Sequence, residues 1–234
     1  MIKQVFLDIE TTGINKTGNN FYYGHKIIEI GAVKVINRHI TNKYFHVYLN
    51  PCRSIDQEAF SIHGINISEL VNKPKFLEIA DQLISFIQHS DLIIHNANFD
   101  VSFINYELSM INHNVKNISN ICNVIDSLKI ARTLFPGKKN SIDALCDRYC
   151  VSKNIRILHG ALLDAKILAN IFLRMTSSQN TIHFDFTNKD KMYKSYKINN
   201  KKLRILYANK EEQILHEQQL DLIQKNGYCL WRNK

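Results

Sequence analysis

Hydrophobic and polar residues alternate over the first 50 residues of the chain, with the period of two that is typical of β-strands rather than helices. In the first of these stretches Val5, Leu7 and Ile9 face one side of the strand, and the residues between them face the other. Two further strands are predicted over 27–36 and 44–49. Because short polar segments connect the three, we expect an antiparallel meander.

At residue 76 the period changes to that of an amphipathic helix, and from there helices and strands alternate. The predicted helices cover 76–87, 99–111, 127–134 and 160–175, with another beginning after Ser141 as its N-cap, and the predicted strands cover 92–94 and 124–125. A meander followed by this alternation predicts an α/β fold, in which helices flank a mixed five-stranded sheet of antiparallel and parallel strands.

The composition shifts after Met175 and divides the chain into three parts. Residues 1–176 are predicted to form one domain of ordinary size. Residues 177–202 are rich in Ser, Asn and Lys and are predicted to form a flexible linker. Residues 203–234 are predicted to form a small C-terminal docking segment.

Within that segment we predict a strand over 203–207, a helix over 211–225 and a last strand over 227–231. A segment of about 30 residues is too short to bury a core of its own, so it either folds back onto the main domain or docks on another protein. The preceding linker and the lone Trp231 favour docking.

The overall composition is that of a globular protein, with 45% hydrophobic and 22% charged residues. The apolar runs are shorter than the roughly 20 residues that a membrane helix needs, and the first residues do not resemble a secretion signal. The five cysteines lack C-x-x-C spacing and are interpreted as reduced thiols, so we expect a cytoplasmic protein.

The chain carries 30 Lys and Arg residues against 21 Asp and Glu, which gives a formal net charge of +9. A basic balance favours a polyanionic partner such as nucleic acid. The alternative is a surface shaped by A/T-rich codons, because the chain is crowded with Asn, Ile and Lys. The charge alone leaves both interpretations open.

Acidic residues recur at three places that suit metal binding. Asp8 and Glu10 leave the same face of the first strand with Cα atoms roughly 6 to 7 Å apart, although such a pair also occurs on solvated sheet faces. Asp100 lies where a buried strand passes into a helix, and its alternative role is that of a first-turn acid that complements the helix dipole. Asp164 lies in the first turns of a later helix, and His159 lies just before that helix.

Taken in order, these segments form a specific pattern. The motifs are Asp8-x-Glu10-Thr11-Thr12-Gly13, His95-Asn96-x-x-Phe99-Asp100 and His159-x4-Asp164. This pattern resembles the DEDDh exonucleases, the DnaQ-like branch of the ribonuclease-H-like superfamily. Residues 24–31, 135–138 and 203–231 are similar to the proofreading members of that family that work within bacterial replicases.

The resemblance implies a ribonuclease-H-like fold and 3′–5′ hydrolysis of DNA ends by a two-metal-ion mechanism, with Mg²⁺ or Mn²⁺ as the cofactor. The ligands that it implies are Asp8, Glu10, Asp100 and Asp164, which offer the oxygen atoms that hard cations prefer. It implies His159 as the general base, against the alternative of a structural histidine at a helix start.

The resemblance also places residues around the 3′ nucleotide, which must be frayed from its partner to enter such a site. These substrate contacts are Asp8, Glu10, Thr11, Glu58, Phe60, His63 and Asp164. Alternatively, Glu58 is a solvated loop acid that does not contact the substrate. The alternative for His63, which precedes Gly64, is that it serves only to shape a turn. His95 either lines the site or ends its strand.

Residues 179–184 resemble the short motif with which replication proteins bind the sliding clamp, and its key positions are Gln179, Ile182 and Phe184. The resemblance assigns 203–234 to docking on the polymerase (alpha) subunit of a replicase, and a small theta subunit is a possible partner. Two alternatives stay open: an RNA 3′-end-trimming exoribonuclease, and a non-catalytic module that only binds nucleic acid.

Overall fold

A computed structural model of the chain describes residues 3–16, 20–152, 160–177 and 206–232. The chain divides into two compact units, Met1–Thr181 and Ile182–Lys234. None of the helices in the described ranges is long and apolar enough to cross a membrane.

The first unit contains a five-stranded sheet with the order β3-β2-β1-β4-β5. Its strands are β1 (Lys3–Thr11), β2 (Ile27–Ile36), β3 (His39–Tyr48), β4 (Asp91–Ile94) and β5 (Asn123–Asp126). β1, β2 and β3 pair antiparallel, whereas β4 pairs parallel with both β1 and β5. The predicted mixed five-stranded sheet is confirmed.

The third strand begins earlier than the predicted residue 44. β3 pairs with β2 from Ile36 opposite His39, across a two-residue turn in which Asn37 and Arg38 have positive φ angles of 48° and 67°. Such turns match the right-handed twist of a hairpin. The early part of β3 is mostly exposed at the edge of the sheet. Its residues are mostly polar, so the sequence there does not show the alternation of hydrophobic and polar residues that predicts a strand.

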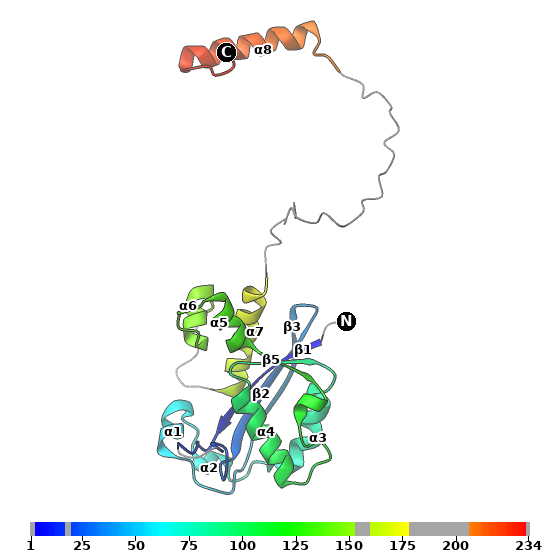
Figure 1. The fold of residues 1–234 in the computed structure, drawn as a ribbon, viewed down its shortest axis with the longest axis vertical. Coiled ribbons are helices and arrows are strands. Elements are labelled where there is room, and N and C mark those ends of the chain that lie inside the picture. The colour runs from blue at the N-terminus through cyan, green and yellow to red at the C-terminus, as the bar shows by residue number, and fades with distance from the viewer. Residues whose placement is uncertain (1–2, 17–19, 153–159, 178–205, 233–234) are drawn as a thin grey trace. The chain divides into compact units, whose positions relative to one another are not determined.

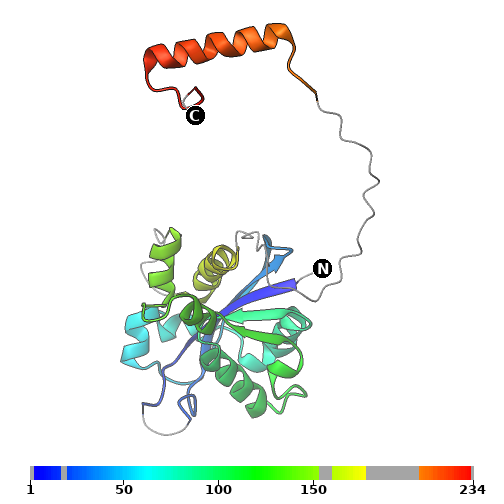
Figure 2. The ribbon, with the colours of Figure 1, turned by 45° about the horizontal axis from the view of Figure 1, so that its top comes forward.

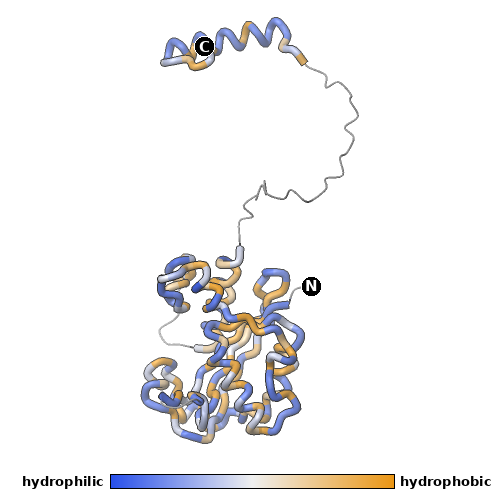
Figure 3. Tube along the Cα trace, in the orientation of Figure 1, coloured by the Kyte–Doolittle hydropathy of each residue, from blue (hydrophilic) through white to orange (hydrophobic). Residues whose placement is uncertain are grey.

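Helices cover both faces of the sheet (Figures 1 and 2). Val5, Leu7 and Ile9 pack in the core beneath α3 (Phe76–Ile87) and α4 (Asn98–Met110). On the other face Phe6 packs beneath α7 (Ala161–Met175), with its ring 5.4 Å from that of Phe172 in an edge-on contact. The strands at the centre of the unit are accordingly hydrophobic in Figure 3. The alternation predicted for the first strand is confirmed.

The remaining helices of the first unit connect these layers. They are α1 (Gln57–His63), α2 (Ile67–Leu70), a 3₁₀ turn over Ile118–Asn120, α5 (Ser127–Leu134) and α6 (Ile142–Tyr149). The Ser141 side chain accepts a hydrogen bond from the backbone of Ala144, which confirms it as the N-cap of α6. The sequence analysis did not predict α1, α2 or the 3₁₀ turn, because such short helices show too few repeats of the helical period.

The second unit contains α8 (Lys210–Asn226), close to the predicted 211–225. The predicted strand over 227–231 is wrong, because the chain turns there. Arg232 forms ion pairs with Glu217 and Asp221 of α8 at 2.7 and 2.6 Å, which bring the end of the segment back along the helix. Residues 206 and 207 are not part of a strand, and 203–205 lie outside the described residues.

Candidate active site

The site begins with two acids on the central strand. Asp8 and Glu10 alternate with the core residues Leu7 and Ile9, so their side chains leave β1 on the face that α7 covers. Both are half-buried. This placement near the carboxyl end of β1 puts two carboxylates beside a helix rather than in open solvent.

The third acid is brought to them by a close contact between β2 and α7. Gly31 pairs with Asp8 in the sheet register. A Cβ atom on Gly31 would lie 2.1 Å from the backbone nitrogen of Leu162 and 2.2 Å from the carbonyl carbon of Ala161, so only glycine admits the helix here. Asp164 follows within the first turn and is buried. One carboxylate oxygen of Asp164 lies within 4.8 Å of one oxygen each from Asp8 and Glu10.

The fourth acid comes from the other side of β1. β4 runs parallel to β1, and the chain passes from its carboxyl end into α4, whose first turn carries the buried Asp100. Burial raises the pKa of Asp100 well above its usual range, and the charge of Asp8 raises the pKa further. Hydrogen bonds from the backbone N–H groups of Asp100 and Ile9 oppose this rise. The carboxylate of Asp100 is therefore costly to ionise without a nearby cation.

Four carboxylates from three segments that are distant in the sequence thus line one cavity. An oxygen-only set of this kind fits a hard divalent cation, which neutralises their mutual repulsion. The predicted general base, His159, lies outside the described residues, which resume at Gly160 immediately before α7.

Two adjacent cavities open around these acids, and they share Ile9, Glu10 and Phe99. The first has a volume of about 270 Å³, and its lining includes all four acids, Asp8, Glu10, Asp100 and Asp164. The second has a volume of about 320 Å³, and its lining includes the predicted substrate contacts Thr11, Glu58 and His63. Phe60 is not among the residues that line either cavity.

Sequence reasoning missed several residues that line these cavities. They are Asn96, Phe99, Ser141, Ile142 and Asp143 in the first cavity, and Ile14, Asp56, Ala59 and Ile62 in the second. Asn96 and Phe99 stand in the recognised motif and were given no role. No spacing in the sequence places Asp143 at the cavity that Asp8 lines, because its position depends on how α6 packs against α7.

Two histidines of the cavities are held in defined positions. His63 accepts a hydrogen bond at Nδ1 from the backbone N–H of Ile65 at 3.0 Å, so its neutral ring carries the proton on Nε2. His95 lines the first cavity, and its Nδ1 lies 3.0 Å from Oγ of Ser127 at the start of α5. Burial lowers the pKa of His95, which favours the neutral ring.

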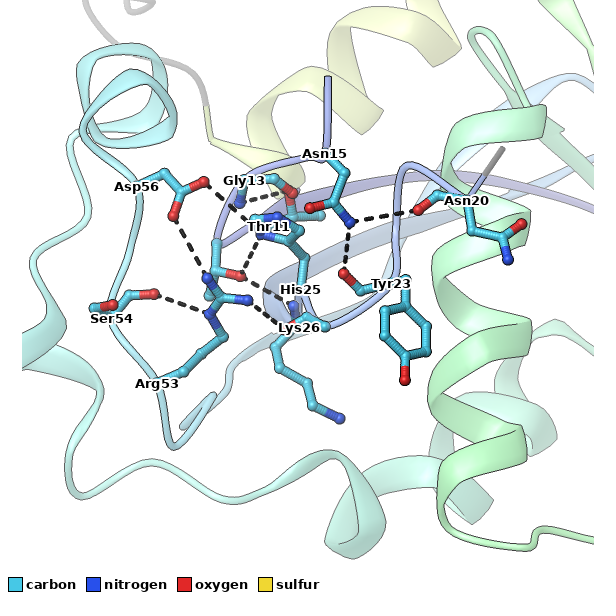
Figure 4. Close-up of polar contacts among 12 residues, drawn as sticks. Thr11, Gly13, Asn15, Asn20, Tyr23, His25, Lys26, Arg53, Ser54 and Asp56 are labelled. Carbon is cyan, nitrogen blue, oxygen red and sulfur yellow. Dashed lines mark hydrogen bonds and ion pairs between the residues drawn. The ribbon is translucent and has the colours of Figure 1, made fainter. Parts of the chain in front are cut away.

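A polar network fixes the turn between β1 and the second cavity (Figure 4). The Thr12 hydroxyl accepts a hydrogen bond from the Lys26 backbone at 3.0 Å, and the Thr12 carbonyl accepts one from the Asp56 backbone at 2.9 Å. Gly13 has a φ angle of 135°, and a Cβ atom there would lie 2.4 Å from the Asp56 carboxylate. The network therefore fixes the start of α1 against the end of β1.

The comparisons with known proteins agree with this geometry. The family model described as "Exonuclease" matches residues 5–172, which include the four acids. The chain is 47% identical to "DNA polymerase III subunit epsilon" of Escherichia coli (strain K12), over 98% of this chain and 97% of that protein. It is 49% identical to the protein of the same name in Buchnera aphidicola subsp. Baizongia pistaciae (strain Bp), over 98% and 96%.

This chain is a DnaQ-like exonuclease. Among solved structures, "Exonuclease X in complex with 5' overhanging duplex DNA" is similar with a TM-score of 0.56 and 26% identity, over 75% of this chain and 90% of that chain. The nuclease domain of 3'hExo, described as a DEDDh family member bound to rAMP, has a TM-score of 0.62 at 17% identity, over 74% and 90%. The latter similarity shows the fold, and the predicted ribonuclease-H-like architecture of the exonuclease is confirmed.

The raised pKa of Asp100 makes the stability of the metal-free exonuclease depend on pH. A carboxyl group whose folded-state pKa lies above its unfolded value contributes stability at low pH, and the contribution is lost as pH rises through the folded-state value. In EDTA, Asp100→Asn is therefore expected to raise the Tm relative to wild type by an amount that grows as pH rises from the acidic range to neutrality. The gain should be a few degrees, because about 1 kcal/mol corresponds to about 2–4 °C in a domain of this size.

Thermal melting of both proteins over that pH range, with and without Mg²⁺, checks this expectation. Added Mg²⁺ should raise the Tm of wild type at neutral pH and remove most of the difference. If the Tm difference does not change with pH, ionisation of the Asp100 carboxyl does not destabilise the folded protein.

Proposed function

We propose that this exonuclease is a proofreading 3′–5′ exodeoxyribonuclease, the epsilon subunit of a DNA polymerase III, that removes mispaired nucleotides from the 3′ end of DNA. The observation that carries the proposal is the convergence of Asp8, Glu10, Asp100 and Asp164 in a chain 47% identical to the Escherichia coli epsilon subunit along nearly its whole length.

In this proposal the four carboxylates hold two divalent cations, Mg²⁺ or Mn²⁺. When bound, such cations activate a water molecule and stabilise the charge that develops on the leaving 3′ oxygen. Asp8 lies close to Asp164 of α7, and its charge acts on Asp100 of α4, so Asp8 would help to hold both ions. Glu10 and Asp164 would help to hold one of them, and Asp100 the other.

His159 is proposed to take the proton of the attacking water. A neutral imidazole does this near neutral pH, and His159 precedes Asp164 by five residues in the sequence. His159→Gln is expected to lower kcat and to remove the acidic limb of the pH–rate profile. If the profile keeps that limb, the general base is another group.

The second cavity is proposed to receive the 3′-terminal nucleotide. Thr11, Glu58 and His63 line it with polar groups, whereas Ile14, Ile62 and Phe99 supply apolar surface for a base. Phe60 is proposed to contact the strand from outside the cavity, because its side chain is exposed. A strand must be unpaired to enter, so a mispaired end, which frays at lower cost, is the preferred substrate.

The same proposal assigns roles to the rest of the chain. Residues 1–176 are the catalytic domain, and residues 203–234 dock on the polymerase alpha subunit, to which α8 offers exposed Ile214, Leu215 and Leu222. Residues 177–202 are the linker, and the motif with Gln179, Ile182 and Phe184, which lies outside the described residues, binds the sliding clamp. Tethering of this kind raises the concentration of exonuclease at the primer end. A theta subunit is a further possible partner.

The experiment that tests the proposed activity compares three substrates with the full chain and Mg²⁺: a matched DNA primer end, a mispaired DNA end and an RNA end of the same sequence. We expect the mispaired DNA end to be hydrolysed fastest and mononucleotides to be released from the 3′ terminus. Equal or faster hydrolysis of RNA would favour a 3′-end-trimming exoribonuclease. If none of the three substrates is hydrolysed, the result would favour a module that only binds nucleic acid.

A further inference from the structure

The cavity that holds the four acids repels the substrate that it must receive. Its lining carries five carboxylates, Asp8, Glu10, Asp100, Asp143 and Asp164, and DNA brings a phosphate with every nucleotide. Bound cations serve the scissile phosphate, but the phosphates upstream of it need other partners. A positively charged surface next to this cavity is therefore expected.

One wall of the cavity continues into such a surface. Residues 127–141 contain four basic residues and no acidic one. The four are Lys129 and Arg132 on α5, and Lys138 and Lys139 in the loop between α5 and α6. All four are exposed, and in the described ranges of the chain none of them forms an ion pair with an acidic side chain. We call these four residues the α5–α6 basic surface.

The loop that carries the two lysines is held in one shape. The Arg148 guanidinium stacks over the Phe135 ring at 4.2 Å and donates hydrogen bonds to the Asn140 side chain and to the Lys139 carbonyl at 3.1 and 2.9 Å. The buried Asn140 amide in turn donates to the carbonyls of Phe135 and Lys138 at 3.2 and 3.0 Å. These contacts fix the backbone of the loop that carries Lys138 and Lys139. The loop therefore loses less conformational entropy when the lysines bind a partner.

The surface is joined directly to the catalytic cavity at both of its ends. Ser141, Ile142 and Asp143 follow Lys139 and Asn140 and line the cavity. At the other end, Ser127 of α5 contacts His95, which also lines it. Arg132 is close enough to His95 to contribute to lowering its pKa, although burial is the larger cause. A strand that leaves the cavity along this wall meets the basic side chains at once.

We propose that the α5–α6 basic surface binds the phosphate backbone of the single DNA strand immediately upstream of the 3′ nucleotide. The inference rests on the proposed function and adds to it the path by which the strand enters. Arg and Lys side chains on such a path hold any sequence, because they contact phosphates and not bases. That property suits an exonuclease that must accept every mispaired end.

The test compares the full-length double variant Lys138→Ala/Lys139→Ala with wild type. Its matched control is Lys3→Ala/Lys43→Ala, which removes two exposed lysines that lie on β1 and β3, away from both cavities. A second control, Lys138→Arg/Lys139→Arg, keeps the charge. Two substrates are used: a short single-stranded oligonucleotide, and an aryl ester of a nucleoside 5′-monophosphate that has no upstream strand.

For the oligonucleotide we expect the alanine variant to raise KM by at least about tenfold at about 0.1 M salt, with kcat unchanged. Each phosphate contact to a single strand contributes about 0.7 to the slope of log K against log salt. At about 0.1 M salt, one contact therefore raises the affinity about fivefold relative to about 1 M salt. The slope should accordingly fall by about 1.4 for two contacts. The ester should be hydrolysed as by wild type, and both control variants should behave as wild type on both substrates.

An unchanged KM and salt slope for the oligonucleotide would overturn the proposal, and so would an equal loss of activity on the ester, which would indicate a distorted site. Fluorescence anisotropy with the same oligonucleotide in EDTA measures the slope without hydrolysis. The binding measurement therefore decides the proposal even if wild type fails to hydrolyse DNA, an outcome that would instead overturn the proposed function.

Discussion

Asp8→Asn is expected to reduce the hydrolysis of a 3′-mispaired primer by at least about three orders of magnitude, because metal-ion stabilisation of the transition state contributes several kcal/mol. Asparagine keeps the shape of the side chain and removes a charge that lies beside Glu10 and Asp164 and that raises the pKa of Asp100 more than the charge of Glu10 does. The site should then lose affinity for divalent cations. Release of the terminal mononucleotide at saturating Mg²⁺ measures the effect.

The matched control is Asp81→Asn, the same chemical change on α3, where the carboxylate is 96% exposed and contacts His113. It should leave the activity unchanged. In EDTA, Asp8→Asn should melt at least as high as wild type, because it removes a charge that repels Asp100. If Asp8→Asn keeps more than a small fraction of the wild-type rate, the carboxylates do not hold the catalytic ions.

Gly31→Ala is expected to have the second-largest effect, although Gly31 does not line either cavity. The new methyl group would overlap the backbone of Ala161 and Leu162 at 2.1 to 2.4 Å, and backbone atoms at the start of a helix cannot rotate away as a side chain can. α7 must shift, and it carries Asp164. We expect a loss of about 1–3 kcal/mol in the free energy of unfolding, as overpacking of a core typically gives.

The loss of activity should exceed what that destabilisation explains, because a shift of about 1 Å in a catalytic group costs about a hundredfold in rate. Chemical denaturation and primer hydrolysis at a temperature where both proteins are folded separate the two effects. Gly227→Ala is the control, because a Cβ atom there meets no described atom within 4 Å. If Gly31→Ala keeps wild-type activity, the start of α7 can move away from β2 without displacing Asp164.

The site acids could be found from the sequence because their motifs lie at predictable ends of elements. β1 and β4 are parallel neighbours, so residues near their carboxyl ends, such as Asp8 and Asp100, reach the same edge of the sheet. The contact that completes the cluster could not be found in this way. It joins Gly31 to residues about 130 positions away, and its closeness depends on the absence of one side chain.

The errors in the predicted fold have related causes. The start of β3 was missed because its exposed edge residues carry no hydrophobic alternation. The apolar residues of 227–231 suit a strand, but a strand needs a partner, and Arg232 instead pairs with acids of α8. The α5–α6 basic surface was hidden among the many lysines of the chain until the fold placed it beside the cavity.

Diffraction at the manganese absorption edge, from crystals of the chain grown with Mn²⁺, tests most directly whether the carboxylate cluster is a metal centre. We expect two anomalous peaks about 3.5–4 Å apart, with oxygens of Asp8 coordinating both. Glu10 and Asp164 should coordinate one of them, and Asp100 should lie beside the other, directly or through water. If the protein is fully active but its crystals show no peak at these four carboxylates, the carboxylate cluster is not the metal centre.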